Sequence, residues 1–289
     1  LFSYWNTICF VRKQLRKYEP DTILSFGDII NPIALLANWG LNNPIYISDR
    51  ISPKQRLSLF KRLFKRLTYP RATGVIAQTC QAAEYKKKVF GDHLNMVIIP
   101  NSLRDIGVYA VEKKNWVIGV GRLSFEKGFD RLLQAFAKIE GHKEWSLVLV
   151  GDGPERERLK ILAADLSIAN RVVFLGLRKD VDRLLAESKI FVIPSRCEGF
   201  PNALCEAMAS PLPCISFDSI AASDIIENRV SGVVLPDGDI EALAREIVIL
   251  MEDEELRNEY AKNAYAIREH LNKDKVGDMF LKFILEGKL

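Results

Sequence analysis

Two glutamates eight positions apart, Glu198 and Glu206, lie in the segment CEGFPNALCE. An ionised carboxylate has only hydrogen-bond acceptors, so its natural partners are hydroxyl groups and cations, and a vicinal diol can bridge both oxygens. Paired acids can also cleave glycosides, but no neighbours here supply the apolar pocket that a general acid needs, so hydrolysis is not favoured. The alternative without function is a pair of carboxylates near the ends of a helix.

The residues between these glutamates predict a loop that turns into a helix. Gly199 permits an unusual backbone angle, and Pro201 suits the first helical position. The next amides, of Asn202, Ala203 and Leu204, would be first-turn donors without partners, and such donors can bind phosphate. Acids on both sides of phosphate-binding amides suit a ligand with diols on both sides of a pyrophosphate, and a nucleotide sugar is such a ligand.

Two cations flank another predicted turn, in the segment GVGRLSFEKGFD. Arg122 and Lys127 lie where a strand passes into a helix, and there the free amides and the helix dipole add to the side-chain charge. A pyrophosphate would fit this turn, and the alternative is two solvated surface cations. A dinucleotide-binding fingerprint matches poorly, because Gly119 and Gly121 lack its third glycine.

Two further loops follow predicted strands. LVLVGDGPERE contains Gly151 and Gly153, which allow a tight turn, although such turns are common in α/β folds for structural reasons alone. In VVFLGLRKD, Leu177 and Arg178 follow Gly176, and backbone together with a flat guanidinium could hold a planar base there. Neither loop identifies a ligand by itself.

The second half of the chain alternates strand-like and helix-like segments, which would bring these loops together. Continuously apolar runs such as LVLVG and IFVIP are typical of parallel strands covered on both faces. The stretch FDRLLQAFAKI places four large apolar residues on one helical face, namely Phe129, Leu132, Leu133 and Phe136. The pattern predicts a doubly wound α/β domain, in which ligands bind at the carboxyl ends of the strands.

The first half shows the same alternation, with strand-like runs in DTILSFG, PIYISDR, GVIAQT and MVIIPNS. Periodicity is lost from Leu103 to Asn115, which predicts a linker. We therefore expect a domain over residues 1–102, a second over 103–267, and a C-terminal helix over 268–289 that packs back on the first. The chain opens without methionine inside a helical pattern, so we expect the first domain to be truncated.

Composition limits the class of protein. Lys and Arg total 41 against 37 acids, a surplus too small to indicate nucleic acid. The five cysteines include no C-x-x-C pair, which favours free thiols and the cytoplasm. No membrane span or signal peptide is visible. The three histidines are far apart, so we expect no metal.

Residues 53–71, PKQRLSLFKRLFKRLTYPR, form a basic amphipathic pattern. Its apolar positions are Leu57, Phe60, Leu63, Phe64 and Leu67, and its cations are Lys54, Arg56, Lys61, Arg62, Lys65 and Arg66. Such a helix can lie on an anionic bilayer, each cation contributing about 1 kcal/mol near the surface. That would place the protein at the inner face of the plasma membrane, whereas the alternative is an ordinary core-facing helix with a solvated side.

Several motifs resemble those of glycosyltransferase family 4, retaining enzymes of the GT-B fold. GRLSFEKG at 121–128 is similar to the family's G-R-L-x-x-E-K-G-like turn, and VGDGP at 150–154 to its V-G-D-G-P motif. Glu198 and Glu206 match its E-x7-E element, and FLG at 174–176 and IPN at 99–101 extend the similarity over nearly the whole chain. The resemblance implies two Rossmann-like domains that face a cleft, and sugar transfer with retained configuration, commonly without a metal or another cofactor.

The resemblance also implies a role for each matching residue. Arg122 and Lys127 would hold the donor pyrophosphate and neutralise the departing nucleoside diphosphate. Glu206 would bind the ribose hydroxyls, and Glu198 would hold the transferred sugar. The expected catalytic residues are thus Arg122, Lys127 and Glu198. The expected donor-binding set adds Gly121, Gly153, Leu177, Arg178, Glu206 and the segment Gly199, Phe200, Pro201, Asn202, Ala203 and Leu204, whose last two amides would meet the distal phosphate.

Some positions depart from the family's pattern. Pro211 stands where glycine is usual, and SIAASDII at 219–226 replaces a Gly-Pro element, which affects the shape of the donor-side loop. Asp49 and Arg50 resemble the Ser-Glu-Arg form of some bacterial members, and we expect them on the acceptor side. We expect the family's first strand and glycine loop to be missing from this chain, which would then be only part of an enzyme.

The expected function is transfer of a hexose or N-acetylhexosamine from a nucleotide sugar, with UDP as the expected nucleotide, to a lipid-linked or surface-polysaccharide acceptor. Two alternatives remain open. One is a sugar-nucleotide 2-epimerase of the same architecture, which would convert its substrate without an acceptor. The other is a non-catalytic module that binds nucleotide sugars.

Overall fold

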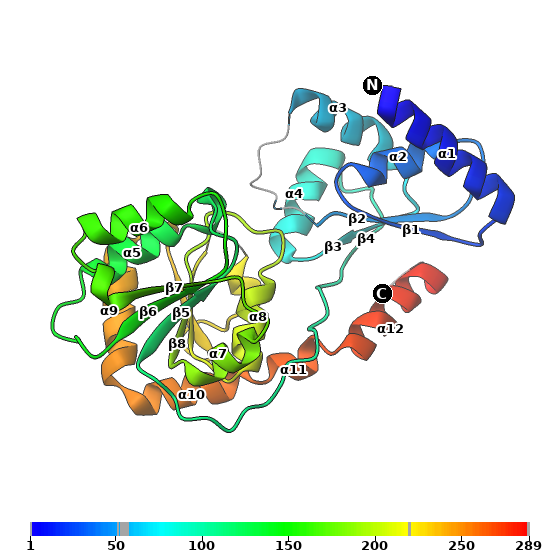
Figure 1. The fold of residues 1–289 in the computed structure, drawn as a ribbon. Helices are drawn as coiled ribbons and strands as arrows, with labels where there is room; N and C mark the ends of the chain where they lie inside the picture. The colour runs from blue at the N-terminus through cyan, green and yellow to red at the C-terminus, as the bar shows by residue number, and fades with distance from the viewer. Residues whose placement is uncertain (1, 51, 53–57, 219–220, 288–289) are drawn as a thin grey trace. The chain divides into compact units, whose positions relative to one another are not determined.

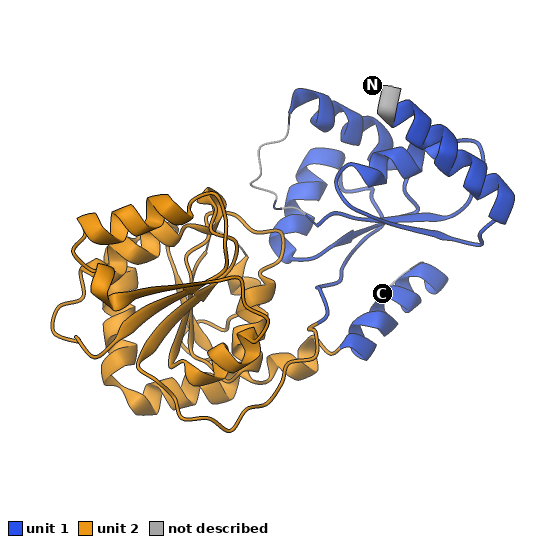
Figure 2. Cartoon of the chain, viewed as in Figure 1, with its two compact units in different colours: residues 1–102, 273–289 blue, residues 103–272 orange. Residues whose placement is uncertain are grey.

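The computed structural model describes residues 2–50, 52, 58–218 and 221–287. The chain forms two compact units, coloured separately in Figure 2: unit 1 comprises residues 1–102 and 273–289, and unit 2 comprises residues 103–272. Unit 2 extends five residues past the boundary that the sequence suggests, because Ile267 and Leu271 are buried in its core. The segment from 103 to 114 contains no helix or strand.

Unit 2 is built on a six-stranded parallel sheet with the order β10-β9-β8-β5-β6-β7. Its strands are β5 (Trp116–Val120), β6 (Ser146–Val150), β7 (Val172–Gly176), β8 (Ile190–Ile193), β9 (Cys214–Phe217) and β10 (Gly232–Leu235). From β5 the sheet grows first toward β7 and then, starting again with β8, toward β10. The two middle strands, β5 and β8, pair at Val117–Ile190 and Ile118–Phe191. In parallel sheets, such a switch point leaves a crevice beyond the carboxyl ends of the two strands.

Helices cover both faces of this sheet, as Figure 1 shows. One face carries α5 (Phe129–Ala137), α6 (Arg156–Asp165) and α9 (Ile240–Glu252), and the other carries α7 (Val181–Glu187), α8 (Asn202–Ala209) and α11 (Ile267–His270). Helix α10 (Glu254–Ala264) contributes Tyr260 to the first core and Ala264 to the second. This two-sided cover explains why strands β8 and β9 are buried at every position.

Unit 1 contains a four-stranded parallel sheet with the order β1-β2-β3-β4. Its strands are β1 (Ile23–Phe26), β2 (Ile45–Ser48), β3 (Gly74–Ala77) and β4 (Met96–Ile98), and its helices are α1 (Phe2–Tyr18), α2 (Ile30–Ala37), α3 (Leu59–Thr68), α4 (Cys80–Phe90) and α12 (Lys273–Glu286). Helices α2 and α4 contribute to the core on one face of the sheet, and α12 inserts Val276 and Phe283 into the core on the other. Gly74 permits this close packing, since a Cβ there would lie 2.6 Å from the Phe283 ring.

The two sheets with their flanking helices confirm the predicted fold class, a chain of two Rossmann-like α/β units. Short 3-10 helices occupy η1 (Tyr69–Arg71), η2 (Phe125–Lys127), η3 (Ala169–Arg171) and η4 (Ala222–Asp224). Within the described part of the chain, no helix is long and apolar enough to cross a bilayer.

Candidate active site

The turn after β5 and the loop after β8 touch each other at the switch point of the second sheet. Gly128, between η2 and α5, has a φ of +66°, and a Cβ at this position would overlap the backbone carbonyl of Pro194. Glycine avoids both the left-handed strain and the collision. The loop that carries the first predicted cations can therefore lie against the loop that carries Glu198.

A lysine and a glutamate from these two loops form an ion pair. Lys127 Nζ donates to Glu198 Oε1 at 2.5 Å, and Ser195 Oγ donates to the same oxygen at 2.9 Å. The lysine side chain is 26% exposed and the glutamate side chain 11%. An ammonium has three N–H donors, so Lys127 can keep this bond and still donate to a ligand.

A second connection holds the same two loops. Arg196, after β8, donates to both carboxylate oxygens of Asp130 at 2.7 and 2.6 Å and to the Phe125 carbonyl at 2.9 Å. Burial alone would raise the pKa of Asp130, but the hydrogen bonds and charge of Arg196 hold it below its ordinary value. Such a bidentate pair fixes orientation as well as distance. No local pattern in the sequence predicts this second connection, because Arg196 and Asp130 are 66 residues apart.

The loop after β6 packs backbone to backbone on the loop after β5. A Cβ on Gly151 would overlap the Gly121 carbonyl, and a Cβ on Gly153 would overlap the Leu123 carbonyl. The amide of Leu123 donates to the Asp152 carbonyl at 3.0 Å. In the structure, Gly151 and Gly153 allow the two loops to pack closely. The donor-binding role of Gly121 and Gly153 stays a prediction.

The start of α8 differs from the sequence expectation. Pro201 is the N-cap rather than the first helical residue. The amide of Asn202 donates to the Phe200 carbonyl at 3.0 Å, and that of Leu204 donates to the Pro201 carbonyl at 3.0 Å. These two amides were expected to lack partners, but the tight turn brings carbonyls within their reach. Phe200 and Leu204 bury their side chains in the core, so any ligand contact there would come from the backbone.

Glu206, further along α8, is held by an arginine that sequence reasoning missed. Arg104 donates from Nε to Glu206 Oε1 at 2.9 Å and from Nη2 to Oε2 at 3.2 Å, while its Nη1 donates to Asp182 Oδ2 at 3.1 Å. The hydrogen bond from Arg104 is the largest cause that lowers the pKa of Asp182. Arg104 lies 78 residues from Asp182 and 102 from Glu206 in a segment without periodicity, so no local pattern could reveal the cluster.

Three further predicted donor residues of unit 2, on the loops after β5 and β7, are exposed. Arg122 lies on the same turn as Lys127. Leu177, just after β7, is 81% exposed. The guanidinium of the next residue, Arg178, donates to both oxygens of Asp180 at 2.8 and 2.7 Å. Since β7 lies two strands from β5, Leu177 and Arg178 begin about 10 Å from the end of β5.

The family model described as "Glycosyl transferases group 1" matches residues 105–267, which is more than half of the chain. The chain belongs to this family of glycosyltransferases. The predicted enzyme class is thereby confirmed, and an epimerase is not favoured.

Two relatives of this glycosyltransferase illustrate the similarity. The amylovoran biosynthesis glycosyltransferase AmsD of Erwinia amylovora is 30% identical, with 86% of this chain and 72% of that protein covered. A Campylobacter jejuni enzyme, GalNAc-alpha-(1->4)-GalNAc-alpha-(1->3)-diNAcBac-PP-undecaprenol alpha-1,4-N-acetyl-D-galactosaminyltransferase, is 26% identical, with 96% of this chain and 78% of that protein covered. Anabaena HepE, solved in complex with UDP, shares the fold with a TM-score of 0.86 at 21% identity, covering 96% of this chain and 82% of that one.

In unit 1 of the glycosyltransferase, Asp49 is 7% exposed and belongs to a buried polar cluster. It accepts hydrogen bonds from Tyr69 Oη at 2.5 Å, Asn31 Nδ2 at 3.1 Å and Lys65 Nζ at 3.2 Å. The neighbouring Arg50 is exposed and donates to Asn101. The structure thus gives Asp49 structural partners, and the expected acceptor-side role of both residues stays a prediction.

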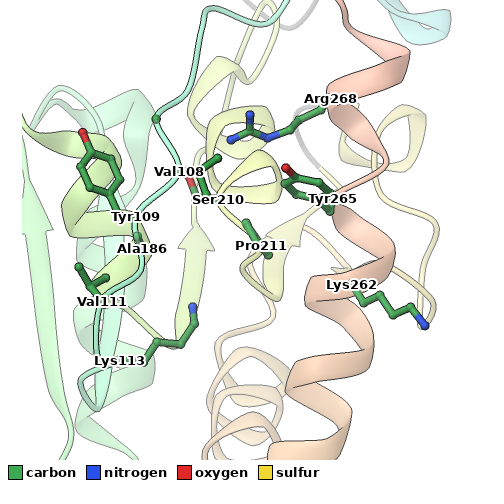
Figure 3. A pocket seen from close by; sticks show the side chains of 11 residues that line it. Val108, Tyr109, Val111, Lys113, Ala186, Ser210, Pro211, Lys262, Tyr265 and Arg268 are labelled. Carbon is green, nitrogen blue, oxygen red and sulfur yellow. The ribbon is translucent and has the colours of Figure 1, made fainter.

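A cavity of about 370 Å³ lies elsewhere in unit 2 (Figure 3). Its walls include the segment that leads into β5 and the C-terminal ends of α7 and α8. The cavity therefore lies near the amino ends of the strands, whereas the switch-point crevice lies beyond their carboxyl ends. Lys113 Nζ donates to the Ser188 carbonyl at 3.0 Å, and Arg268 Nε to the Ala209 carbonyl at 2.9 Å. Burial, with the charges of Lys189 and Arg257, lowers the pKa of Lys113 to about 8. These cations satisfy carbonyls at helix ends, which explains their presence without a ligand.

Within the ranges that the structure describes, no three His, Cys, Asp or Glu side chains gather as a metal site would require. All five cysteines are free, and burial raises the pKa of Cys205 and Cys214.

Proposed function

We propose that this glycosyltransferase transfers a hexose or N-acetylhexosamine from a UDP-sugar to a lipid-linked or surface-polysaccharide acceptor. In this proposal the enzyme belongs to glycosyltransferase family 4 and retains the configuration of the transferred sugar. The observation that carries the proposal is the meeting of Lys127 and Glu198 at the switch point between β5 and β8. It combines a cation for a diphosphate with a carboxylate for sugar hydroxyls. The relatives that act on undecaprenol-linked sugars and in amylovoran synthesis support the acceptor class.

The spacing of the loops suits an extended donor. The diphosphate would lie at Arg122 and Lys127, with the transferred sugar at Glu198. The base would lie toward Leu177 and Arg178, two strand spacings or about 10 Å away. Glu206 would receive the ribose diol. In this arrangement the amide of Ala203, in the first turn of α8, would contribute to the phosphate site.

The reaction breaks the bond between the anomeric carbon and the diphosphate oxygen and forms a bond from the same face to the acceptor oxygen. The proton of the acceptor hydroxyl passes to the departing diphosphate. Negative charge grows on the departing diphosphate. Arg122 and the remaining N–H donors of Lys127 would stabilise that charge. The bond to Glu198 keeps the lysine in place, and Ser195 donates to the same glutamate oxygen. Orientation of the acceptor would supply the other part of the rate. We propose that no metal or other cofactor takes part.

The proposal predicts that Lys127→Ala lowers kcat for sugar transfer about 10²–10³-fold, the usual effect of removing one donor that stabilises developing charge. The measurement is transfer of labelled sugar from UDP-sugars to lipid-linked acceptors, with NMR of the product to establish its anomeric configuration. Lys160→Ala, an exposed lysine paired with Glu157 on α6, is the matched control and should keep full activity.

Equal activity in both lysine variants would reject the site. An inverted product would reject the retaining mechanism. The epimerase alternative makes the opposite prediction for an incubation without acceptor, since only an epimerase would convert the UDP-sugar there. A non-catalytic module would bind UDP-sugars but transfer nothing to any acceptor.

We further propose that α3 docks this cytoplasmic enzyme on an anionic membrane. The apolar side chains of this helix point outward: Leu59 is 82% exposed, Leu63 58% and Leu67 59%. The side that faces the protein instead carries Lys65, whose ammonium pairs with Asp28 and with Asp49. A helix with a polar inner side and an apolar outer side suits a lipid interface rather than water. The predicted positions Lys54, Arg56 and Leu57 lie outside the described residues.

Liposome sedimentation tests this docking. The wild-type protein should bind vesicles that contain anionic lipid at low salt and release them as salt rises, because cations near the surface contribute about 1 kcal/mol each. Leu63→Asp should reduce binding about tenfold or more, since it places a charge on the apolar side. Leu281→Asp, which changes a leucine of α12 that is 57% exposed, is the control and should bind as the wild type does. Equal binding by the two variants would exclude α3 as the docking surface.

A further inference from the structure

Arg104 connects three separate parts of unit 2. Its guanidinium donates to Glu206 on α8 and to Asp182 on α7. The amide of Gly107, from the same irregular segment, also donates to Asp182, at 3.1 Å. The arginine is therefore fixed against α7 from one side while it holds the carboxylate of α8 with the other.

The carboxylate of Glu206 keeps free acceptor positions in this arrangement. A carboxylate has about four lone-pair sites, and Arg104 uses one on each oxygen. The Glu206 side chain is 20% exposed, so solvent reaches it. One acceptor position on each oxygen therefore remains for a pair of hydroxyl groups, and the arginine need not leave for a diol to bind.

Removal of Arg104 would change the direction in which Glu206 points. Asp182 and Glu206 share this one guanidinium, and without it two carboxylates would face each other without a cation between them. Like charges repel, so Glu206 would turn toward water, and a flexible glutamate must lose rotamer freedom again when it binds a diol.

We infer that Arg104 is a positioning residue for the donor site, which holds Glu206 in the orientation that receives the ribose diol and thereby makes the enzyme prefer ribonucleotides over deoxyribonucleotides. This inference rests on the proposed function, in which Glu206 binds the ribose. Arg104 contacts the glutamate and not the nucleotide.

The experiment is calorimetric titration of the full chain with UDP and with 2′-deoxy-UDP. A hydrogen bond to a charged group favours binding by about tenfold to a hundredfold, so the wild type should prefer UDP by about that ratio. Arg104→Ala should bring the ratio to about threefold or less, and so should Glu206→Ala. Arg183→Ala is the matched control, an exposed arginine of α7 that pairs with Glu187, and it should keep the wild-type ratio.

Arg104→Lys provides a second variant if Arg104→Ala does not fold. A lysine keeps one ion pair but cannot hold two carboxylates in bidentate fashion, so its ratio should be intermediate. A general structural role for Arg104 would weaken both nucleotides equally and leave the ratio unchanged, which overturns the inference. Tighter binding of UDP by Arg104→Ala would also overturn it, since the arginine would then be blocking the diol.

Different results would overturn the positioning role of Arg104 and the ribose-binding role of Glu206. If Glu206→Ala loses the preference for ribose and Arg104→Ala keeps it, the positioning role is wrong and the proposed donor site stands. If the wild type shows no preference, or Glu206→Ala keeps it, the ribose role of Glu206 is wrong and the inference falls with it. Failure of the wild type to bind either nucleotide overturns both.

Discussion

At the scale of single residues, the site depends on groups that bring loops together rather than on those expected to touch the donor. Gly128 lets the turn after β5 lie against Pro194, and Arg196 then binds Asp130 across the same junction. Lys127 and Glu198 meet as a result. Each of these contacts joins residues that are more than 60 positions apart, so each one forms only when the tertiary structure brings the two loops together.

Gly128→Ala should destabilise the protein by about 2–5 kcal/mol. A left-handed alanine costs about 1–2 kcal/mol, and the overlap with the Pro194 carbonyl adds the cost of overpacking. The control is Gly141→Ala, with a φ of +89° and no atom within 4 Å of the added Cβ, which should lose only the first contribution. Urea unfolding measures both, and equal losses would show that the contact with Pro194 does not matter.

The pair of Asp130 and Arg196 predicts a dependence on pH. The folded pKa of Asp130 lies below its ordinary value, so its contribution to the free energy of unfolding is complete above about pH 4 and disappears as the pH falls through the folded pKa. Asp130→Asn should therefore cost about 1–3 kcal/mol at pH 7 and progressively less below pH 4. Exposed Asp165→Asn should show no such convergence. A constant difference between Asp130→Asn and the wild type down to about pH 2 would contradict the assignment.

At the scale of elements, α3 shows how charge can decide the orientation of a helix. Its apolar residues would pack well in a core, yet Lys65 faces inward, where it forms ion pairs with Asp28 and Asp49. The hydroxyl of Tyr69 and the amide of Asn31 complete the shell around Asp49. This buried cluster fixes the helix and leaves Leu59, Leu63 and Leu67 outside.

Lys65→Met should destabilise unit 1 by about 3–5 kcal/mol, because it removes the buried cation that Asp28 and Asp49 share and leaves only the more distant Lys61 and Lys86. Lys61→Met is the matched control. That lysine is 42% exposed and lies 3.8 Å from Asp28, so its loss should cost less than about 1 kcal/mol. Thermal unfolding compares them. A Lys65→Met variant as stable as Lys61→Met would mean that the aspartates do not anchor the helix.

At the scale of the whole molecule, the proposed tasks are divided between the units. All residues proposed for the donor lie in unit 2, whereas the residues expected on the acceptor side, Asp49 and Arg50, lie in unit 1. Helix α12 returns to unit 1 after unit 2 is complete, and its Val276 and Phe283 pack on the first sheet. The core of unit 1 is therefore built from residues that lie before and after unit 2 in the sequence.

Hydrogen exchange with and without UDP should show this division. A ligand at 100 times its Kd stabilises the binding state by about 2.7 kcal/mol. We expect added protection in the loops after β5, β6, β7 and β8 and in α8, and little change in the strands of unit 1. Protection that appears mainly in unit 1 would contradict a donor site in unit 2.

The sequence by itself determined the fold class and the enzyme class, glycosyltransferase. Apolar runs such as LVLVG and IFVIP are typical of parallel strands covered on both faces, and the turn residues after each strand mark the edge where ligands bind. The order of motifs from GRLSFEKG to Glu198 and Glu206 was sufficient to recognise a glycosyltransferase. These features are local, so short windows of sequence contain them completely.

Tertiary structure alone decided which side chains meet. Periodicity shows that α3 has an apolar side, but its partners Asp28 and Asp49 determine that this side points away from the protein. The binding of Glu206 by Arg104 spans 102 residues, and the carbonyls that occupy the first amides of α8 depend on the turn at Pro201. Contacts of this kind follow from the folding of distant segments onto one another, and no spacing along the chain encodes them.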